Sequence, residues 1–174
     1  MPRDFNILAT TLRGLERSAC FELRHLLEQI GDPSVDVRKS GIRGLIAAKT
    51  SLDEFQAVKS LREILVKRPY EFRYILRIIP IQTIVPTDLK AIADKASELS
   101  SNIAEDETFR VTVEKRFTTL HTREIIEAVA ANIKRKVNLD VPDRILLVEV
   151  VGNATGISVV RPEDIISVMK EKML

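Results

Sequence analysis

Apolar and polar positions in the first half of the sequence follow two periods, one of about two residues and one of about 3.6 residues. Apolar residues from Leu15 to Ile30 recur on one helical face, and Gly31-Asp32-Pro33 ends that helix. Ser51 and Glu54 have the spacing of a capping box at the start of a second helix. The predicted elements are, in order, a strand at 5–10, a helix at 16–30, strands at 34–39 and 44–50, a helix from Ser51 to the residue before Pro69, and a strand at 72–79.

This β-α-β-β-α-β order is that of ferredoxin-like domains, in which two helices cover one face of an antiparallel sheet. We therefore expect an α+β protein whose residues 1–80 form an N-terminal ferredoxin-like domain. Arg73 and Arg77 alternate with apolar residues on the last predicted strand. Because side chains alternate between the two faces of a sheet, we expect both arginines on the face away from the helices.

The second half begins after a boundary marked by Pro80 and Pro86, and it predicts an α/β domain over residues 81–174. The run RILLVEVVG is nearly all apolar, which is typical of a strand buried on both faces. The run GNATG joins two strands and predicts a hairpin turn. The predicted elements are a helix at 89–103, a strand at 109–117, a helix capped by Thr122 and running to Val137, strands at 144–152 and 156–160, and a final helix opened by Pro162.

The 174 residues carry a formal net charge of only +2, but this charge is unevenly distributed. Residues 109–138 contain 7 Lys and Arg against 3 Asp and Glu, and residues 1–85 contain 14 against 10. Residues 86–108 between these blocks are acidic, with 2 basic residues against 6 acidic ones. Two basic blocks separated by an acidic one are typical of a surface that faces a polyanion, although solvated helix faces produce the same pattern.

Composition narrows the class of protein further. Cys20 is the one cysteine in the sequence, so no intrachain disulfide can form and we expect a cytoplasmic setting. No apolar run approaches the roughly 20 residues needed to cross a bilayer, and the first residues lack the pattern of a signal peptide. Aromatic residues make up 5% of the chain and tryptophan is absent, so base stacking is not expected to dominate contacts with a nucleic acid.

The strand-to-helix unit FRVTVEKRFTTLHTREIIEAVAANIKRK has basic residues at both ends. Lys115 and Arg116 close the predicted strand, and the next helix begins near His121, Thr122 and Arg123. Backbone amides at a helix start are unpaired donors at the positive end of the helix dipole. Placed next to Lys115 and Arg116, these amides would form a compact site for phosphate.

Further cations could extend this phosphate site. Lys134, Arg135 and Lys136 follow at the predicted C-terminal end of the same helix, where the alternative is that they stabilise the helix dipole. A second group lies in the predicted hairpin turn RKSGIRG. The additional candidates for contact with a nucleic-acid backbone are Arg38, Lys39 and Arg43 of that turn, together with Arg73 and Arg77.

The sequence contains no clear motif for cofactor, metal or nucleophilic chemistry. No GxGxxG follows a predicted strand and no Walker-type loop is present, so we expect no cofactor. His25 and His121 lie far apart in sequence and there is no pair of cysteines, so we expect no metal site. No nucleophile–base set stands out either. We therefore expect a binding protein that is not itself an enzyme.

The second half resembles the THUMP domain, an RNA-binding module found in tRNA-modifying proteins. The features that carry the resemblance are FRVTVEKRF, the helix HTREIIEAVAANI and the strand pair RILLVEVVGNATGISV. In that family a ferredoxin-like domain often precedes the module, as residues 1–80 would here. The segment YILRIIPIQTIVPTDL is similar to the junction in stand-alone THUMP proteins that serve as adaptors for tRNA cytidine acetylation.

The resemblance implies a tRNA-binding adaptor that presents tRNA to a separate modification enzyme, with a cytidine acetyltransferase as the expected partner. The sequence stops at Leu174, directly after the module, so we expect no catalytic domain. One alternative is the RNA-binding subunit of another tRNA-modifying enzyme, such as a methyltransferase. Another is a small-molecule-sensing regulatory protein built on the ferredoxin-like half. Many cations and few aromatic residues favour recognition of the RNA backbone and shape over base readout.

Overall fold

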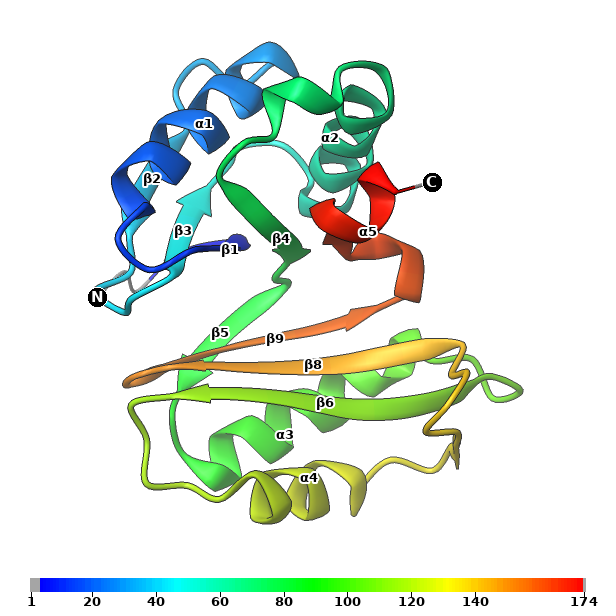
Figure 1. Cartoon of the computed structure of the whole chain (residues 1–174). Helices are drawn as coiled ribbons and strands as arrows, with labels where there is room; N and C mark the ends of the chain where they lie inside the picture. Colours follow the sequence, from blue (N-terminus) through cyan, green and yellow to red (C-terminus); the bar gives the residue numbers. More distant parts are fainter. Residues whose placement is uncertain (1–3, 174) are drawn as a thin grey trace. The chain divides into compact units, whose positions relative to one another are not determined.

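The computed structural model describes residues 4–173 as a mixed α/β protein, with two five-stranded sheets and five α-helices in that range. The chain forms two compact units, which are seen in Figure 1. The first unit takes residues 4–81 and 164–173, and the second takes residues 82–163. Each unit has its own sheet and its own hydrophobic core. No helix within 4–173 is long and apolar enough to span a membrane.

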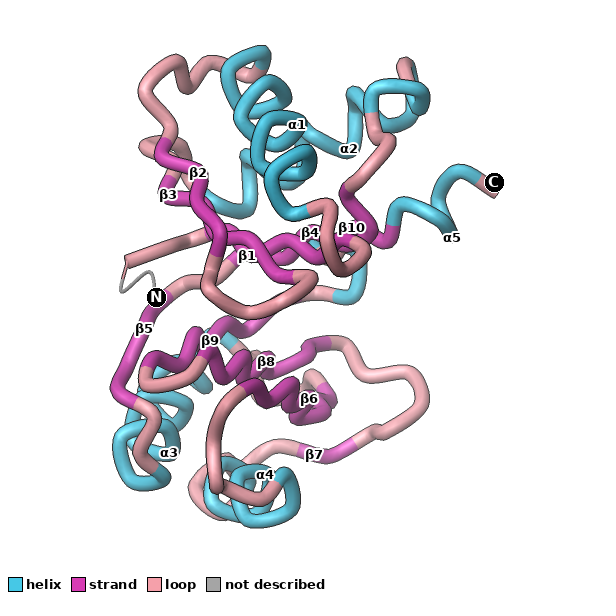
Figure 2. The backbone as a smooth tube through the Cα atoms, turned by 60° about the vertical axis from the view of Figure 1, so that its left-hand side comes forward, coloured by secondary structure: helices cyan, strands magenta, loops and turns pink. Residues whose placement is uncertain are grey.

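The first unit combines one sheet with three helices. Its elements are β1 (Ile7–Thr11), α1 (Glu16–Gln29), β2 (Asp36–Lys39), β3 (Leu45–Lys49), α2 (Glu54–Lys67), a 3-10 turn (Pro69–Glu71), β4 (Ile75–Pro80), β10 (Ile166–Ser167) and α5 (Val168–Lys172). The sheet is antiparallel throughout, in the order β10-β4-β1-β3-β2. Figures 1 and 2 show α1 and α2 on the same face of this sheet. The predicted β-α-β-β-α-β order is therefore present from β1 to β4.

The start of α2 differs from its predicted cap. Asp53 is the capping residue, and its Oδ1 accepts hydrogen bonds from the backbone N–H groups of Phe55 and Gln56, each at 3.0 Å. The predicted capping box of Ser51 and Glu54 is wrong, because a carboxylate one residue before the helix satisfies two first-turn donors at once.

The last strand and helix lie in the first unit, whereas the sequence predicted a helix opened by Pro162 in the second domain and no strand there. Pro162 instead begins a 3-10 turn, and the helix starts at Val168. β10 pairs antiparallel with β4, with Ile166 opposite Ile78, and so extends the sheet at the β4 edge. Ile166 and Val168 are fully buried in the core of this unit. Arg62 of α2 also pairs with Glu171 of α5, with Nε 2.6 Å from Oε1. Local periodicity predicts that residues near the C-terminus form a helix, but it does not say which sheet buries them.

The second unit is built around a mixed sheet in the order β5-β9-β8-β6-β7. Its elements are β5 (Thr83–Pro86), α3 (Leu89–Leu99), a 3-10 turn (Ser100–Asn102), β6 (Thr108–Arg116), α4 (Thr122–Ala130), β7 (Lys136–Val137), β8 (Arg144–Val151), β9 (Ala154–Val160) and a 3-10 turn (Pro162–Asp164) that leads back to the first unit. β6 runs parallel to β7 and β8, while β9 is antiparallel to β8 and β5. Figure 1 shows α3 and α4 on one face of the sheet.

Burial in the second unit confirms the prediction for its central strand. Every residue of β8 after Arg144 is buried, as is every residue of β9. Gly152 and Asn153 form the tight turn between these strands, and Gly152 has a φ of 62°, which a glycine adopts without strain. The predicted domain boundary, however, contains β5, which pairs with β9. Pro80 precedes that short strand and Pro86 is its last residue, and prolines in such positions are typical of a connection, so the strand was not predicted.

Candidate functional site

Strand β6 places its two terminal cations on opposite faces of the second sheet. Phe109, Val111 and Val113 pack in the core beneath the helices, so Lys115 lies on the helix side and Arg116 on the other side. Lys115 is exposed, and its Nζ donates a hydrogen bond to the carbonyl of Leu120 at 3.2 Å. No carboxylate within 4–173 lies at ion-pair distance from Lys115, so its charge is available to an anion from outside.

Arg116 has a different environment from Lys115, although the two are neighbours in sequence. Its side chain is only 17% exposed, and its Nη1 lies 3.8 Å from Oε2 of Glu149, which is 1% exposed. A carboxylate that is buried to this extent requires a nearby cation. Arg116 therefore balances a charge inside the unit, and the structure does not bring it together with Lys115 as one phosphate clamp.

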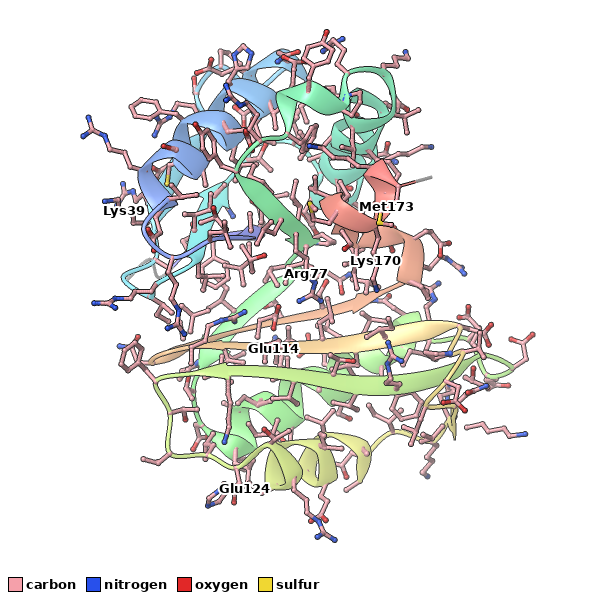
Figure 3. The ribbon with its side chains drawn as sticks, in the orientation of Figure 1. Lys39, Arg77, Glu114, Glu124, Lys170 and Met173 are labelled. Atoms are coloured by element: carbon pink, nitrogen blue, oxygen red, sulfur yellow. The ribbon has the colours of Figure 1, made fainter. Side chains whose placement is uncertain are left out.

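The start of α4 is already partly satisfied within the chain. His121 takes the capping position, and Thr122, which the sequence predicted as the cap, is the first helical residue. The backbone N–H of His121 donates to Oε1 of Glu124 at 2.7 Å. Figure 3 shows Glu124 at this end of α4. The prediction that these amides are all unpaired donors is therefore wrong for His121, because a carboxylate three residues later reaches back to it.

Arg123 remains a strong candidate for anion contact. Its side chain is 90% exposed, and its Nε lies 2.9 Å from Oε1 of Glu127, which is itself 65% exposed. An exposed pair of this i,i+4 kind contributes only about 0.3–0.5 kcal/mol. Arg123 can consequently exchange Glu127 for a phosphate at little cost.

Lys134, Arg135 and Lys136 do not lie at a helix terminus. α4 ends at Ala130 rather than at Val137, and the chain turns so that Lys136 joins the edge strand β7. Arg135 donates from Nε to the carbonyls of Ile103 and Ala104, at 2.9 and 3.1 Å. The helix-dipole interpretation of this triplet is therefore wrong. Arg135 links two loops of the unit, while Lys134 and Lys136 are exposed.

The basic hairpin of the first unit has one exposed cation in its connecting loop. Arg43 is exposed there, between Gly41 and Gly44, which both have positive φ. On β2, Arg38 is 70% exposed and its Nε lies 2.9 Å from Oδ1 of Asp36. Lys39, labelled in Figure 3, is exposed on the same edge strand. Because side chains alternate along β2, Arg38 and Lys39 point to opposite faces of the sheet.

Arg73 and Arg77 do not share a strand in the structure. β4 begins at Ile75, so Arg73 precedes it, and the backbone N–H of Arg73 donates to Glu22 on α1 at 2.7 Å. Arg77 does lie on β4 (Figure 3), opposite Thr10 of β1 and next to the core residue Ile78. The predicted alternation therefore holds for Arg77 alone, and it places that side chain on the face away from the helices.

The opposite end of β6 is rich in charges that neutralise one another. Glu107 accepts hydrogen bonds from the backbone N–H of Ala104 at 2.9 Å and from Nε of Arg144 at 3.2 Å. The Ala104 amide, followed by Arg144, lowers the pKa of the Glu107 carboxyl below its ordinary value. The backbone amide of Thr108 similarly lowers the pKa of Asp143. Arg144 therefore stabilises the fold at this end of the sheet through its bond to Glu107.

Sequence reasoning missed one aromatic residue of the second unit. Phe117 follows β6 directly, is 75% exposed, and is the one non-glycine residue with positive φ in the described chain, at 55°. A bulky residue in that conformation costs on the order of 1–3 kcal/mol. An open groove of about 550 Å³ lies beside it, lined by Thr87, Thr118, Thr119, Gly152 and Asn153. The available signal was a phenylalanine next to two threonines in the strand-to-helix connection.

A second missed aromatic residue lies on the first unit. Phe21 of α1 is 57% exposed, and the guanidinium carbons of Arg17 and Arg24 lie 5.9 and 5.7 Å from its ring centroid. Both arginines are thus within range of a cation–π contact. Phe21 falls outside the apolar stripe of α1, and that position was the signal for its exposure.

Residues that commonly bind metals are dispersed within the described range. His25 lies on α1 in the first unit, and His121 lies at the start of α4 in the second. Residues 4–173 contain no group of three or more His, Cys, Asp or Glu side chains that could hold a metal ion. The exposed cations of the second unit that can contact an anion are Lys115, Arg123, Lys134 and Lys136. The structure does not bring all four together, because Lys136 lies opposite Thr108, at the other end of β6 from Lys115.

Comparison with known protein families identifies the second unit. The sequence model of the THUMP domain matches residues 86–160, which run from the last residue of β5 to the end of β9. This part of the chain is a THUMP domain, as its sequence motifs predicted. None of the curated proteins matches the chain by sequence.

Solved structures share the fold of most of the chain. PH1313 from Pyrococcus horikoshii matches with a TM-score of 0.64 and 19% identity, over 91% of this chain and 55% of that one. TrmN from Thermus thermophilus matches with a TM-score of 0.58 and 14% identity, over 90% of this chain and 45% of that one. A 4-thiouridine synthetase, solved with RNA and ATP, matches with a TM-score of 0.51 and 19% identity, over 91% and 42%. The chain thus spans about half the length of the solved structures that it matches.

Proposed function

We propose that this chain binds tRNA through its second unit and presents it to a separate tRNA-modifying enzyme. The observation that carries the proposal is the THUMP domain at residues 86–160, with exposed cations on its surface. The segment at 74–89, which resembles the junction of acetylation adaptors, favours a cytidine acetyltransferase as the partner enzyme. One structure with the same fold, the 4-thiouridine synthetase, was solved as a complex with RNA, which supports RNA as the ligand.

The charges of the second unit support contact with a phosphate backbone. Lys115, Lys134 and Lys136 are exposed and have no carboxylate partner within 4–173, and Arg123 has only the exposed Glu127. Such side chains can neutralise phosphates and release counterions, so RNA binding should weaken steeply as salt rises. The partner contacts of Arg116 and Arg135 make them structural residues, and we leave both out of the proposed interface.

Two further proposals concern the rest of the molecule. The first unit is proposed to be a ferredoxin-like domain that β10 extends, and its β4-β1-β3-β2 strand order supports this assignment. The chain is proposed to contribute binding and no chemistry, and to act in the cytoplasm, where its single cysteine, Cys20, would remain reduced.

The non-catalytic role is tested by incubating the purified chain with tRNA and group donors, followed by mass spectrometry of the nucleosides. Modification by the chain alone would overturn it.

Binding to folded tRNA, measured by fluorescence anisotropy at about 50 and 200 mM salt, tests the proposed interface. The test variant is Lys115→Ala/Arg123→Ala, because both side chains are exposed and neither balances a buried charge. The control is Lys90→Ala/Lys95→Ala, which removes two positive charges from α3 of the same unit. Lys90 pairs with Asp94 at i,i+4, as Arg123 pairs with Glu127.

We expect wild-type affinity to fall steeply between the two salt concentrations. The test variant should bind more weakly, and the slope of log K against log salt should drop by about 0.7–0.9 for each phosphate that is no longer neutralised. The control variant should keep the wild-type slope. Equal losses in both variants would remove Lys115 and Arg123 from the interface, and salt-independent or absent binding would refute the RNA-binding function itself.

A second candidate partner is a tRNA methyltransferase. Several solved structures that share the fold are described as methylases or methyltransferases, one of them in complex with SAH. The two candidates are separated by capture of the tagged chain from its native cells in the presence of tRNA, followed by identification of the co-purified enzyme. Recovery of a methyltransferase without an acetyltransferase would favour this second candidate.

A further inference from the structure

Three segments of the second unit meet beside Phe117 and form a groove of about 550 Å³. They are the β5–α3 connection with Thr87, the β6–α4 connection with Thr118 and Thr119, and the β8–β9 turn with Gly152 and Asn153. Figure 1 shows the β8–β9 turn and the end of β6 next to each other at the same end of the sheet. Phe117 is the one large apolar side chain in the lining, and the other lining residues are three threonines, a glycine and an asparagine.

Hydrogen bonds between the three segments hold this groove in shape. The backbone N–H of Gly152 donates to the carbonyl of Arg116 at 2.9 Å, which ties the β8–β9 turn to the end of β6. The backbone N–H of Thr87 donates to the carbonyl of Asn153 at 3.0 Å, and the hydroxyls of Thr87 and Thr155 lie 2.8 Å apart. A groove held in this way exists before a ligand arrives, so binding requires little reorganisation.

The ring of Phe117 is exposed to solvent, and its backbone has a positive φ that is unfavourable for a bulky residue. Its side chain is 75% exposed, so packing of the ring does not compensate for the positive φ. Backbone strain at an exposed residue is typical of a site that serves a ligand. Lys115 lies two residues earlier, and its Nζ bonds to the same β6–α4 connection through the carbonyl of Leu120. An aromatic face and a cation therefore lie beside the groove.

We propose that this groove binds one unpaired nucleotide of the RNA, with its base against the ring of Phe117 and its phosphate near Lys115. The inference rests on the proposed RNA-binding function and adds a site to it. Base–aromatic stacking tolerates any base, and the threonine hydroxyls and the Asn153 amide can bond to the ribose or the base edge. A pocket for an apolar side chain of a protein partner would be lined by several apolar residues, whereas this one contains Phe117 alone.

The absence of tryptophan from the sequence permits a direct test. The variant Phe117→Trp introduces one tryptophan at the groove, and Phe21→Trp introduces one on the exposed face of α1 as a control. Three RNAs share one hairpin stem closed by the same tight tetraloop: one blunt, one with an unpaired 3′ extension and one with an internal bulge. In the Phe117→Trp variant, an RNA with an unpaired nucleotide should quench the introduced fluorophore, whereas the blunt RNA should not. Comparison of the extended RNA with the bulged RNA shows whether the groove binds an unpaired nucleotide at a 3′ end or one inside a stem.

Affinity measurements complete the test. Phe117→Ala should weaken binding of the extended or bulged RNA by about 5- to 150-fold, which is the range for loss of one stacked base, and should leave blunt-stem binding unchanged. Phe117→Gly, which also accepts the positive φ, should give the same loss and so excludes backbone strain as its cause. Unchanged affinity in both variants, or equal losses for all three RNAs, would overturn this site. If wild type binds folded tRNA but none of these three RNAs, this site alone is overturned, and if it binds neither, the proposed function fails as well.

Loss of enzyme capture with unchanged RNA affinity in Phe117→Ala would also overturn the nucleotide site, because the groove would then serve a protein partner. Thermal melting of each variant provides the folding control. Since Phe117 is exposed and strained, neither Phe117→Ala nor Phe117→Gly should lower the melting temperature.

Discussion

Replacement of Ile166 by alanine should destabilise the first unit selectively, although Ile166 follows the whole second unit in sequence. Ile166 is fully buried, pairs with Ile78 of β4, and lies in the same core as α1 and α2. Truncation of a buried isoleucine to alanine costs about 2–5 kcal/mol, through lost transfer free energy and the cavity that remains. A domain of this size is stabilised by only about 5–15 kcal/mol, so the loss is a large fraction of its stability.

Hydrogen exchange followed by mass spectrometry measures the loss of unfolding free energy for each unit separately. Amides of β1 and β4 that exchange by unfolding of the first unit should lose protection by about 30-fold to several thousandfold, since each 1.4 kcal/mol is tenfold. Amides of β6 and β8 should keep their protection, because those strands belong to the other core. The control is Met169→Ala in α5, three residues further on and 61% exposed, which should change neither set.

Two results would refute this reasoning. Loss of protection concentrated in β6 and β8 would mean that the C-terminal strand stabilises the second unit, as the sequence pattern alone suggested. An equal effect of Ile166→Ala and Met169→Ala would mean that burial at position 166 does not contribute the stability assigned to it.

The remaining predictions concern single buried or strained positions, and thermal or urea unfolding checks each of them. Arg116→Met should destabilise the second unit by at least about 1 kcal/mol because it leaves the buried Glu149 without this cation, whereas Lys115→Met should change stability by less than about 0.5 kcal/mol; equal effects would contradict the assignment of the two faces. Burial raises the pKa of Asp32, but bonds from the Thr50 hydroxyl and the Ser51 and Ser34 amides outweigh it and hold the pKa below its ordinary value. The stability that ionised Asp32 contributes is therefore fully present above the unfolded pKa of about 3.9 and is lost as the pH falls through the lower folded pKa. Asp32→Asn should therefore be less stable than wild type at neutral pH and should lose less stability on acidification. Parallel profiles of stability against pH for the two proteins would contradict this. Gly44→Ala should destabilise more than Gly14→Ala, because both have positive φ but only Gly44 would place a Cβ 3.0 Å from the carbonyl of Thr11; similar losses would show that this contact relaxes freely.

Periodicity predicted most elements of both units because each buries one continuous stripe against one sheet. The buried face of α1 and the doubly buried strand β8 are examples, since their patterns are complete within a short window. The end of α4 was missed because Ile133 continues the apolar spacing after the helix has stopped, and it packs in the core from a loop. The place of β10 was missed because pairing between distant segments leaves no local trace.

The candidate site was predictable only as a group of residue types. Lys115 and Arg123 were identified correctly as exposed cations near a strand-to-helix connection, and the sequence pattern carries that information. Arg116 could not be separated from Lys115, because its partner Glu149 lies on another strand. Phe117 could not be recognised either, since its positive φ and its groove depend on loops from three parts of the chain.

The alternation along β6 has a practical consequence for anyone who aligns this chain with distant relatives. Lys115 and Arg116 are adjacent basic residues, so an alignment displaced by one position would still match a basic residue with a basic residue in one column. It would nevertheless equate a solvent-facing lysine with an arginine that neutralises an interior acid. The core position Val113 should therefore anchor such alignments, because an apolar residue there determines which of the two following columns faces outward.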